Sequence, residues 1–466
     1  MVFTSHVFVF YFLPLVLAGY YLLPRGRNAF LLAASYLFYA WWNPAFVVLM
    51  FVVTAINYGG AKVIGTPGAS AVRRHAAVVV SVAASLGLLG FFKYFVFMQD
   101  NLNGILAAFG AQPLGVWRIV LPVGISFYTF QSLSYTVDVY RGVCPPVRSF
   151  TDFACFVALF PQLIAGPILR YNAIAPQLRE RTHTLDKFAG GAALFILGFA
   201  RKILLANSVG QVADIAFAAD GLLPLDAWFG AAAYAFQIYF DFAAYSDMAV
   251  GLGRMLGFEF DRNFNAPCRA ESITDFWRRW HISLSTFLRD YLYVPLGGNR
   301  RGPRRTYINL AVVMLLGGLW HGANWTFVLW GAWHGVLLII ERAANKRSLY
   351  RLLPRAVRIG ITFVLVLFGW VLFRSDTVGE AMHYLAAMFA RAPAAPGAML
   401  VSARLYTPAN LSMMVLCAVL AFGPLQAFEY VRRITWPKVV LLIVLFVVSL
   451  MAMSAQAFNP FLYFQF

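Results

Sequence analysis

Uninterrupted apolar runs, long enough to form membrane-crossing helices, recur along the whole of this 466-residue sequence. Hydrophobic residues make up 61% of the chain and charged residues 12%, whereas soluble domains contain roughly 45–50% apolar and about 25% charged residues. Only a bilayer accepts so many apolar side chains, and the runs lack the alternating pattern of an outer-membrane barrel. The sequence therefore predicts an all-α, polytopic membrane protein and excludes an ordinary soluble enzyme.

The apolar runs predict about eleven transmembrane helices, together with broken segments, because some runs are shorter than the roughly 20 residues that cross a bilayer. No linker or internal repeat separates them, so we expect a single transmembrane domain over residues 1–466. Its core motifs lie within residues 120–345 and its C-terminal helices within residues 356–466, while the stretch 391–410 is expected to be an external loop. The runs are residues 7–23, 28–42, 44–61, 76–98, 119–140, 188–206, 228–256, 308–320, 325–341, 359–373, 411–428 and 439–458.

Basic residues outnumber acidic ones, with 37 Lys and Arg against 19 Asp and Glu and a formal net charge of +18. Such an excess can signal nucleic-acid binding, but here the basic residues lie in short loops between apolar runs, as the positive-inside rule expects. We therefore expect membrane lipids, and no nucleic acid, as partners. The cysteines and histidines show no metal-binding spacing, so no metal site is predicted.

Two features within the apolar runs are unusual for a simple membrane anchor. Residues 150–168 are flanked by basic residues on both sides and interrupted by Pro161, Gly166 and Pro167, which predicts a re-entrant segment. Asp241 and Asp247 lie in an apolar stretch, and carboxylates at membrane depth are costly. We expect these two carboxylates to be either functional or paired with cations.

Three of the seven histidines, His281, His321 and His334, lie in aromatic and glycine-rich stretches. His321 stands at the turn between runs 308–320 and 325–341, whose far ends carry arginines and are expected to be cytoplasmic. Thirteen helical residues cover roughly 20 Å, less than a bilayer core of about 30 Å, so His321 is predicted to lie deep in the membrane. A buried imidazole can accept and return a proton. A packing role, or haem ligation by the three histidines, stays open at this point.

The stretch from Glu271 to Tyr293 is expected to form a helix that opens with a plausible N-terminal cap. Helical spacing places Trp277 and His281 on one face. Asp275 and Arg279 are four residues apart and can form an ion pair on the same helix. We expect the aromatic face of this helix to form one wall of a pocket.

Several motifs resemble those of the membrane-bound O-acyltransferase (MBOAT) family. They are Phe276-Trp-Arg-Arg-Trp-His281, Leu296-Gly-Gly-Asn-Arg300, Leu315-Leu-Gly-Gly-Leu-Trp-His321-Gly-Ala-Asn324 and Tyr245-Ser-Asp-Met248. With Leu121-Pro-Val-Gly and Phe160-Pro-Gln-Leu, the resemblance extends over most of the chain. It implies a helical bundle, with re-entrant segments, around a central tunnel in the bacterial inner membrane.

Within this family the chain is most similar to the branch that acetylates the polysaccharide alginate. The resemblance implies an O-acetyltransferase that moves acetyl groups from a cytoplasmic donor, acetyl-CoA, across the inner membrane to an exopolysaccharide, with no bound cofactor. Periplasmic acetyltransferase-type proteins and polysaccharide export machinery are the expected partners. Gln162 and the Ala243-Ala244 pair depart from the alginate branch, so cellulose or another envelope glycan is the alternative acceptor. A glycan or precursor transporter is the alternative from another functional class.

The family's invariant histidine falls on His321 and its second histidine on His281, which makes these two the candidate catalytic residues. We expect His321 to act as general base on the acceptor hydroxyl and His281 to orient the donor or assist proton transfer. A covalent acetyl-histidine relay is a variant of this mechanism. Further residues are candidates for shaping the pocket or stabilising an oxyanion. They are Trp277, Trp280, Asp275, Arg279, Trp320 and Asn324.

Overall fold

The computed structural model describes residues 1–345, 350–391, 396–456 and 461–462, and every regular element within these ranges is a helix. The chain folds into two compact units. Unit 1 comprises Met1–Ala192 and Ala249–Asp261, and unit 2 comprises Ala193–Met248 and Arg262–Phe466. The all-helical class expected from the sequence is confirmed, whereas the single-domain organisation stays a prediction.

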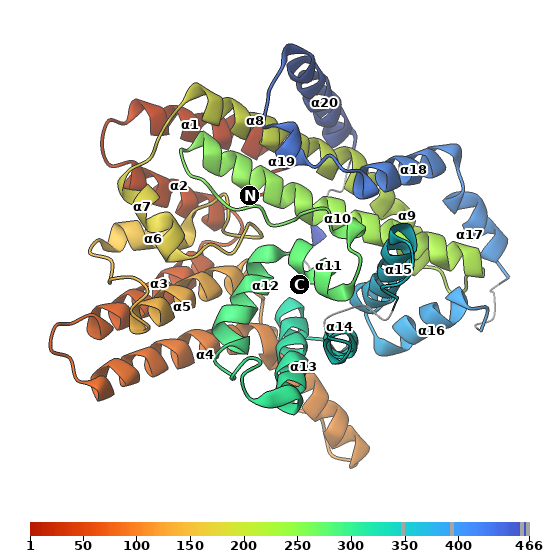
Figure 1. Cartoon of the computed structure of the whole chain (residues 1–466), viewed down its shortest axis with the longest axis horizontal. Helices are drawn as coiled ribbons and strands as arrows, with labels where there is room; N and C mark the ends of the chain where they lie inside the picture. The colour runs from red at the N-terminus through yellow and green to blue at the C-terminus, as the bar shows by residue number, and fades with distance from the viewer. Residues whose placement is uncertain (346–349, 392–395, 457–460, 463–466) are drawn as a thin grey trace. The chain divides into compact units, whose positions relative to one another are not determined.

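The helices follow one another in the order labelled in Figure 1. The first are η1 (Val7–Phe12), α1 (Leu13–Leu22), α2 (Arg27–Ala40), α3 (Ala45–Ile64), α4 (Ala71–Ala108), α5 (Ile125–Tyr140), α6 (Phe150–Ala158), α7 (Tyr171–Arg179) and α8 (Leu185–Ala200). There follow η2 (Arg201–Ala206), α9 (Asn207–Phe217), α10 (Pro224–Met255), η3 (Pro267–Arg269), α11 (Ile273–Arg279), α12 (Ile282–Leu288), η4 (Arg289–Tyr293), α13 (Gly302–His321) and α14 (Trp325–Ala343). The last are α15 (Arg355–Arg374), α16 (Val378–Met388), α17 (Ala398–Leu405), α18 (Pro408–Phe422), α19 (Ala427–Tyr430) and α20 (Trp436–Ala455).

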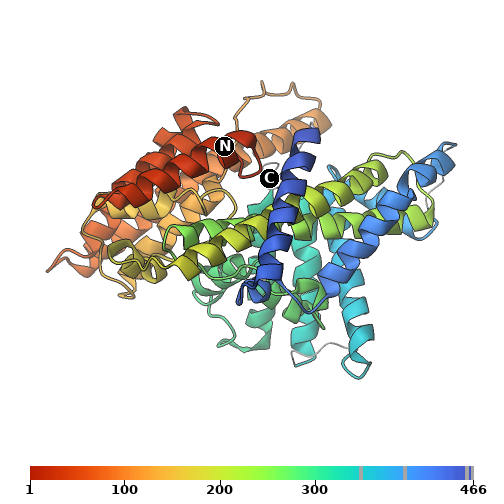
Figure 2. The ribbon, with the colours of Figure 1, turned by 90° about the horizontal axis from the view of Figure 1, so that it is seen from above.

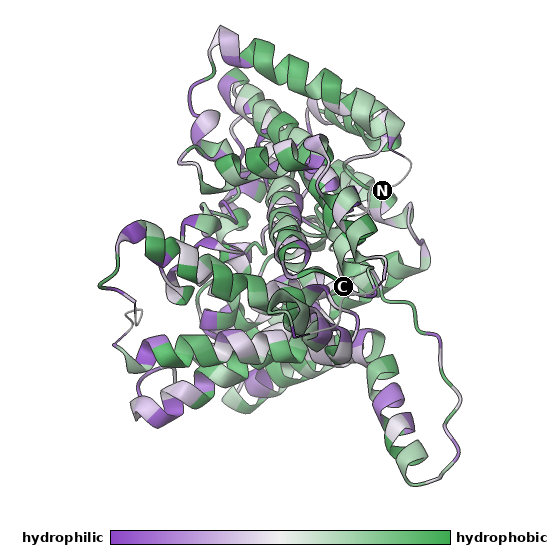
Figure 3. Ribbon diagram, turned by 90° about the vertical axis from the view of Figure 1, so that its right-hand side faces the viewer, coloured by the Kyte–Doolittle hydropathy of each residue, from purple (hydrophilic) through white to green (hydrophobic). Residues whose placement is uncertain are grey.

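Among the described residues, five helical stretches are long and apolar enough to cross a membrane. They are α3, α4, the stretch from α8 through η2 to α9, α15 and α20, and the bent pair α17–α18 forms a sixth candidate with an angle of 61°. Apolar residues cover much of these helices, and hydrophilic residues gather at helix ends and loops (Figure 3). A multi-pass membrane protein is thereby confirmed, whereas about eleven crossings remain a prediction.

Some helix boundaries differ from the expectation. The stretch 391–410 was expected to be an external loop, but it contains α17, whose Ala, Leu and Met residues are strong helix formers. α4 continues past the expected end at residue 98 as far as Ala108. The last expected run, 439–458, ends in residues that lie outside the described ranges.

Residues 159–170 connect α6 to α7 in unit 1 through irregular, almost entirely buried backbone. The side-chain amide of Gln162 donates a hydrogen bond to the carbonyl of Phe156 at 2.8 Å. A Cβ at Gly166 would lie 2.5 Å from the Cα of Gln162, so this turn requires glycine. The predicted helix break is confirmed, and its backbone is buried in protein as such segments require. That the segment re-enters the membrane stays a prediction.

Ion pairs join η2 to α10 in the interior of unit 2. Arg201 contacts Asp247 at 2.6 Å, and Lys202 pairs with Asp241. The other carboxylate oxygen of Asp241 accepts a hydrogen bond from the backbone amide of Leu462 at 2.8 Å. Of the two outcomes expected for these carboxylates, functional or paired, the structure shows pairing.

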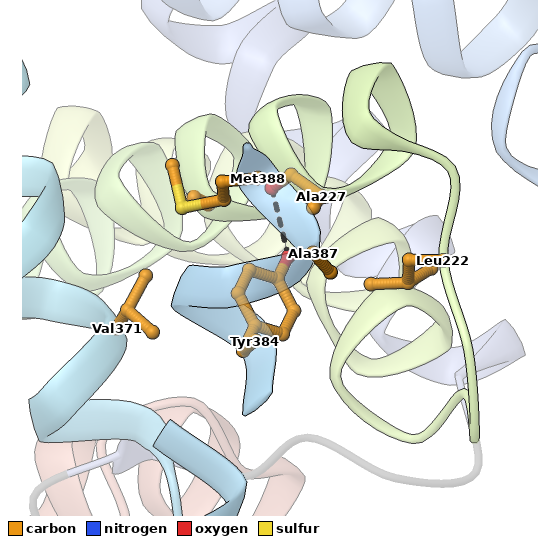
Figure 4. Close-up of a cluster of buried hydrophobic side chains, with 7 residues drawn as sticks. Leu222, Ala227, Val371, Tyr384, Ala387 and Met388 are labelled. Carbon is orange, nitrogen blue, oxygen red and sulfur yellow. Dashed lines mark hydrogen bonds between the residues drawn. The ribbon is translucent and has the colours of Figure 1, made fainter. Parts of the chain in front are cut away.

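A cluster of buried apolar residues fixes α16 against α10 and α15 in unit 2 (Figure 4). Tyr384 of α16 lies at its centre, and its hydroxyl donates a hydrogen bond to the carbonyl of Ala227 at 2.9 Å. The ring of Tyr384 also stacks on Phe217 with a centroid distance of 4.2 Å. Val371 belongs to the same cluster, so this packing holds the C-terminal half of α15, which also carries residues of the histidine cluster described next.

Candidate active site

The hairpin of α13 and α14 presents His321 at its turn. A Cβ on Gly318 would lie 2.2 Å from the carbonyl oxygen of Phe327, so glycine allows the two helices to approach closely. α13 ends at His321, and Asn324 caps α14 by accepting a hydrogen bond from the amide of Thr326 at 3.1 Å. His321 is 4% exposed, so the hairpin buries it within the protein.

The predicted start of the helix before His321 was wrong. α13 begins at Gly302 and not near residue 308, because arginines of a basic stretch also adopt helical geometry in its first turns. Its 20 residues cover about 30 Å, the thickness of a bilayer core, so a short helix no longer argues for depth. The depth of His321 in the membrane therefore stays a prediction, while its burial in protein is observed.

His281 stands at a sharp bend between α11 and α12, where a continuous helix was expected. Its φ of +43° lies in the left-handed region that non-glycine residues rarely adopt. Asn263 fixes the bend, because its side-chain oxygen accepts hydrogen bonds from the amide and hydroxyl of Ser283 at 3.0 and 2.9 Å. The same oxygen lies 3.3 Å from Nδ1 of the fully buried His281. Strained backbone that surrounding contacts hold in place is typical of functional sites.

His281 and His321 converge on one indole. The ring of Trp320 lies 6.0 Å from that of His281 and 5.0 Å from that of His321, measured between centroids. All three side chains are buried in unit 2. The expectation that the two histidine motifs form parts of one pocket therefore corresponds to an observed cluster of side chains.

Two further predicted residues, Trp277 and Trp280, line the same aromatic cluster from α11 and its end. Trp277 packs edge-on against Trp330 at 5.6 Å, and Trp280 lies 4.9 Å from Trp370 of α15. Phe373, one turn further along α15, contacts His321 at 5.2 Å. These rings surround the histidines with apolar aromatic surface.

Three predicted pocket residues make contacts of a structural kind. Asp275 and Arg279 form an ion pair of 2.9 Å, both about a quarter exposed, and Arg279 also donates to the carbonyl of Asn265. Asn324 caps α14 and donates its side-chain amide to the carbonyl of Asp376 at 2.7 Å. These bonds hold the bend and the hairpin, and a direct role for the three residues in catalysis stays a prediction.

His334 of α14 belongs to the cluster, although from the sequence only packing or haem ligation was considered for it. Trp330 contacts both His321 and His334 at 5.0 Å, and a Cβ on Gly369 would lie 2.9 Å from Nε2 of His334. Within the described residues, neither ring nitrogen of the buried His334 has a hydrogen-bond partner. The Trp-His-Gly pattern at His321 recurs at residues 333–335, and this repeat is the sequence signal that could have placed His334 in the cluster. Trp320 lies between His281 and His321, and Trp330 lies between His321 and His334, which disfavours a haem between these pairs.

Residues 146–376 match the membrane-bound O-acyltransferase family. The chain is 46% identical over the full length of both proteins to the "Probable alginate O-acetylase AlgI" of Azotobacter vinelandii. It is 52% identical to the protein of the same name from Pseudomonas aeruginosa, over 84% of this chain and 75% of the relative. A "Peptidoglycan O-acetyltransferase" of Helicobacter pylori is 36% identical over 83% of this chain and 80% of the relative.

The chain belongs to the membrane-bound O-acyltransferase family. The matched region of this O-acyltransferase contains both candidate histidines, the bend at His281 and the whole α13–α14 hairpin. Family membership favours acyl transfer over the alternatives of a transporter or an inactive scaffold. In the described part of the chain, no group of three or more His, Cys, Asp or Glu side chains is placed to hold a metal ion. The absence of a cofactor stays an expectation.

Proposed function

We propose that this enzyme O-acetylates an exopolysaccharide, that the polymer is alginate, and that His321 is the catalytic base. The observation that carries the proposal is the convergence of two buried histidines, His281 and His321, on Trp320. The higher identity to alginate O-acetylases than to the peptidoglycan O-acetyltransferase supports alginate. Cellulose or another envelope glycan is the alternative acceptor for the same chemistry.

The proposed reaction uses the ability of an imidazole to accept a proton while a hydroxyl attacks a thioester. His321 removes the proton from an acceptor hydroxyl as the oxygen attacks the carbonyl carbon of an acetyl thioester. The tetrahedral intermediate then expels the thiolate, the acetyl ester remains on the acceptor, and the proton passes from His321 to the thiolate. His281, held by Asn263, orients the donor or assists this transfer. The aromatic walls keep water from competing with the acceptor.

The donor in this proposal is acetyl-CoA, which is made in the cytoplasm and is too large and charged to cross lipid. Exposed arginines at 300, 301, 304 and 305 lie at the start of α13, at the far end of that helix from His321. Their positive potential attracts the phosphates of CoA. A central tunnel through about eleven inner-membrane helices would then bring the thioester to His321. Periplasmic acetyltransferase-type proteins and the export machinery would take the acetyl group onward.

The experiment compares ester-linked acetate on the secreted polysaccharide from cells with the wild-type protein, His321→Ala or His383→Ala. His383 is an exposed histidine on α16 in the same unit and serves as the matched control. At equal membrane levels of the protein, we expect His321→Ala to reduce acetate about 10²–10⁴-fold, the usual contribution of a general base, with unchanged polymer yield. His383→Ala should behave as wild type.

Normal acetate in the His321→Ala strain would overturn the catalytic assignment. Loss of the polymer itself, with its acetate content per sugar retained, would favour the transporter alternative. The same acetate measurement on cellulose or peptidoglycan, in strains that make these polymers, identifies the acceptor. Acetate loss confined to one of these polymers would replace alginate in the proposal.

A further inference from the structure

A large apolar cavity lies in unit 2, away from the histidine cluster. Its volume is about 740 Å³, within the range of sites that bind lipids and other small molecules. The end of α8, η2, Ser208 of α9 and Phe240 of α10 line one side, and residues of α18, α19 and α20 line the other. Figure 2 draws α20 as the dark-blue helix near the C-terminal end of the chain. Leu416, Leu420, Leu425 and Leu441 line it and are 42–60% exposed, so the cavity opens on the outside of the unit.

The cavity runs along α20, a candidate membrane-spanning helix. Residues that line it on α20 extend from Leu441 to Ala452, which at 1.5 Å per helical residue corresponds to about 16 Å, and Gln456 lines it just past the end of the helix. α20 is one of the five stretches apolar enough to cross a bilayer. A cavity that opens beside such a helix faces the hydrocarbon of the membrane. Its open side and apolar walls fit an apolar occupant from the membrane, such as a lipid acyl chain.

The polar residues inside the cavity are already satisfied by the protein. Arg201 lines it, but Asp247 neutralises this guanidinium at 2.6 Å. The side-chain oxygen of Gln426 accepts a hydrogen bond from the hydroxyl of Tyr239 at 2.8 Å. That of Gln456 accepts one from the amide of Asn207 at 2.6 Å. The cavity itself therefore offers hydrophobic contact and no uncompensated charge to an occupant.

Free positive charge instead lies at one end of the cavity, in the turn between α19 and α20. Arg432 and Arg433 are exposed there. Lys438 ties this turn to the cavity wall, because its ammonium donates to the carbonyls of Tyr430 and Arg433 at 2.6 and 2.8 Å. Tyr430 itself lines the cavity. Trp436, 82% exposed at the start of α20, is typical of the membrane–water interface. Basic residues at that level attract anionic lipid headgroups.

We propose that this cavity binds one anionic phospholipid, with an acyl chain between η2, α18 and α20 and its phosphate at Arg432 and Arg433. The volume and apolar walls fit the chain, and the exposed arginines fit the headgroup. The elements from α16 onward lie outside the residues that match the family. The lipid site is independent of the proposed acetyl transfer, because it shares no residue with the histidine cluster.

The test is native mass spectrometry of the full chain, purified in detergent and titrated with phosphatidylglycerol or with phosphatidylcholine of identical acyl chains. Leu445→Trp projects a larger side chain into the cavity and narrows it, and the matched control Val444→Trp alters the neighbouring residue on α20, which does not line it. We expect the wild type and Val444→Trp to retain one phosphatidylglycerol, and Leu445→Trp to lose it. Equal retention by the two tryptophan variants would overturn the site.

A second comparison, between lipids that differ in headgroup charge, tests the headgroup assignment. The wild type should bind phosphatidylglycerol on the order of tenfold more tightly than phosphatidylcholine, given about 1 kcal/mol per basic residue at the surface. Arg432→Gln with Arg433→Gln should remove this preference. The control Arg25→Gln with Arg179→Gln makes the same charge change at other exposed positions and should keep it. Equal binding of the two lipids by the wild type would overturn the anionic assignment.

Discussion

Unit 2 buries polar groups in two regions that treat them in opposite ways. Between η2 and α10, each buried charge has a partner, since Lys202 pairs with Asp241 and Arg201 with Asp247. In the histidine cluster, the polar nitrogens lie among aromatic rings, and those of His334 have no hydrogen-bond partner within the described residues. Burial of a polar group alone therefore does not mark a site. The paired charges of η2 and α10 hold the fold, whereas the ring nitrogens of His334 remain available to a substrate.

Breaking one ion pair should have the largest effect on stability. Lys202→Met leaves Asp241 buried without its cation, which should lower the free energy of unfolding by about 3–5 kcal/mol. Thermal unfolding of the detergent-purified protein measures this change. The double variant Lys202→Met with Asp241→Leu removes both charges and should recover most of the loss. A double variant no more stable than the single one would mean that the pair contributes packing and not charge balance.

The hairpin offers a comparison between adjacent glycines. Gly318→Ala places a Cβ 2.2 Å from the carbonyl oxygen of Phe327, so the helices must separate at a cost of about 1–3 kcal/mol. Gly317→Ala is the matched control, because its Cβ would meet only the flexible end of Leu288 at 3.3 Å. Unfolding temperature and polymer acetate should both fall in the first variant and stay near wild type in the second. Equal behaviour would contradict the close approach of α13 and α14.

Replacing His334 by phenylalanine separates a catalytic use of its nitrogens from a packing role. His334→Phe keeps a ring between Trp277 and Trp330 and removes two unsatisfied polar atoms, so stability should rise by about 1 kcal/mol. Polymer acetate should fall about tenfold if the substrate uses a hydrogen bond from this ring. Unchanged acetate with higher stability would assign His334 to packing alone.

The smallest effect is expected at the Asp275–Arg279 pair, which is about a quarter exposed. A double-mutant cycle of Asp275→Asn and Arg279→Gln, followed by thermal unfolding, should give a coupling of less than about 1 kcal/mol. A coupling as large as that of Lys202 and Asp241 would show that the bend before His281 depends on this pair and not on Asn263.

The sequence predicted most of the site, because its signals are local. The α13–α14 hairpin, the turn at His321 and the aromatic spacing around His281 all follow from short motifs. The bend at His281 was missed because Asn263, eighteen positions earlier, fixes it. The start of α13 was missed because arginines mark a membrane boundary without ending a helix. The place of His334 in the cluster was missed, because Phe276 and Trp277 of α11 and Gly369 of α15 also surround its ring and lie far from it in the sequence.

The left-handed backbone at His281 has a consequence for how its side chain can be studied. Glycine is the residue that adopts such a φ without strain, so His281→Gly preserves the path of the chain while it deletes the imidazole. The space that the ring leaves, enclosed by Phe242 and Trp320, has the shape of a free imidazole molecule. Glycine can thus reproduce the backbone conformation of His281, and free imidazole from solution can take the place of its ring.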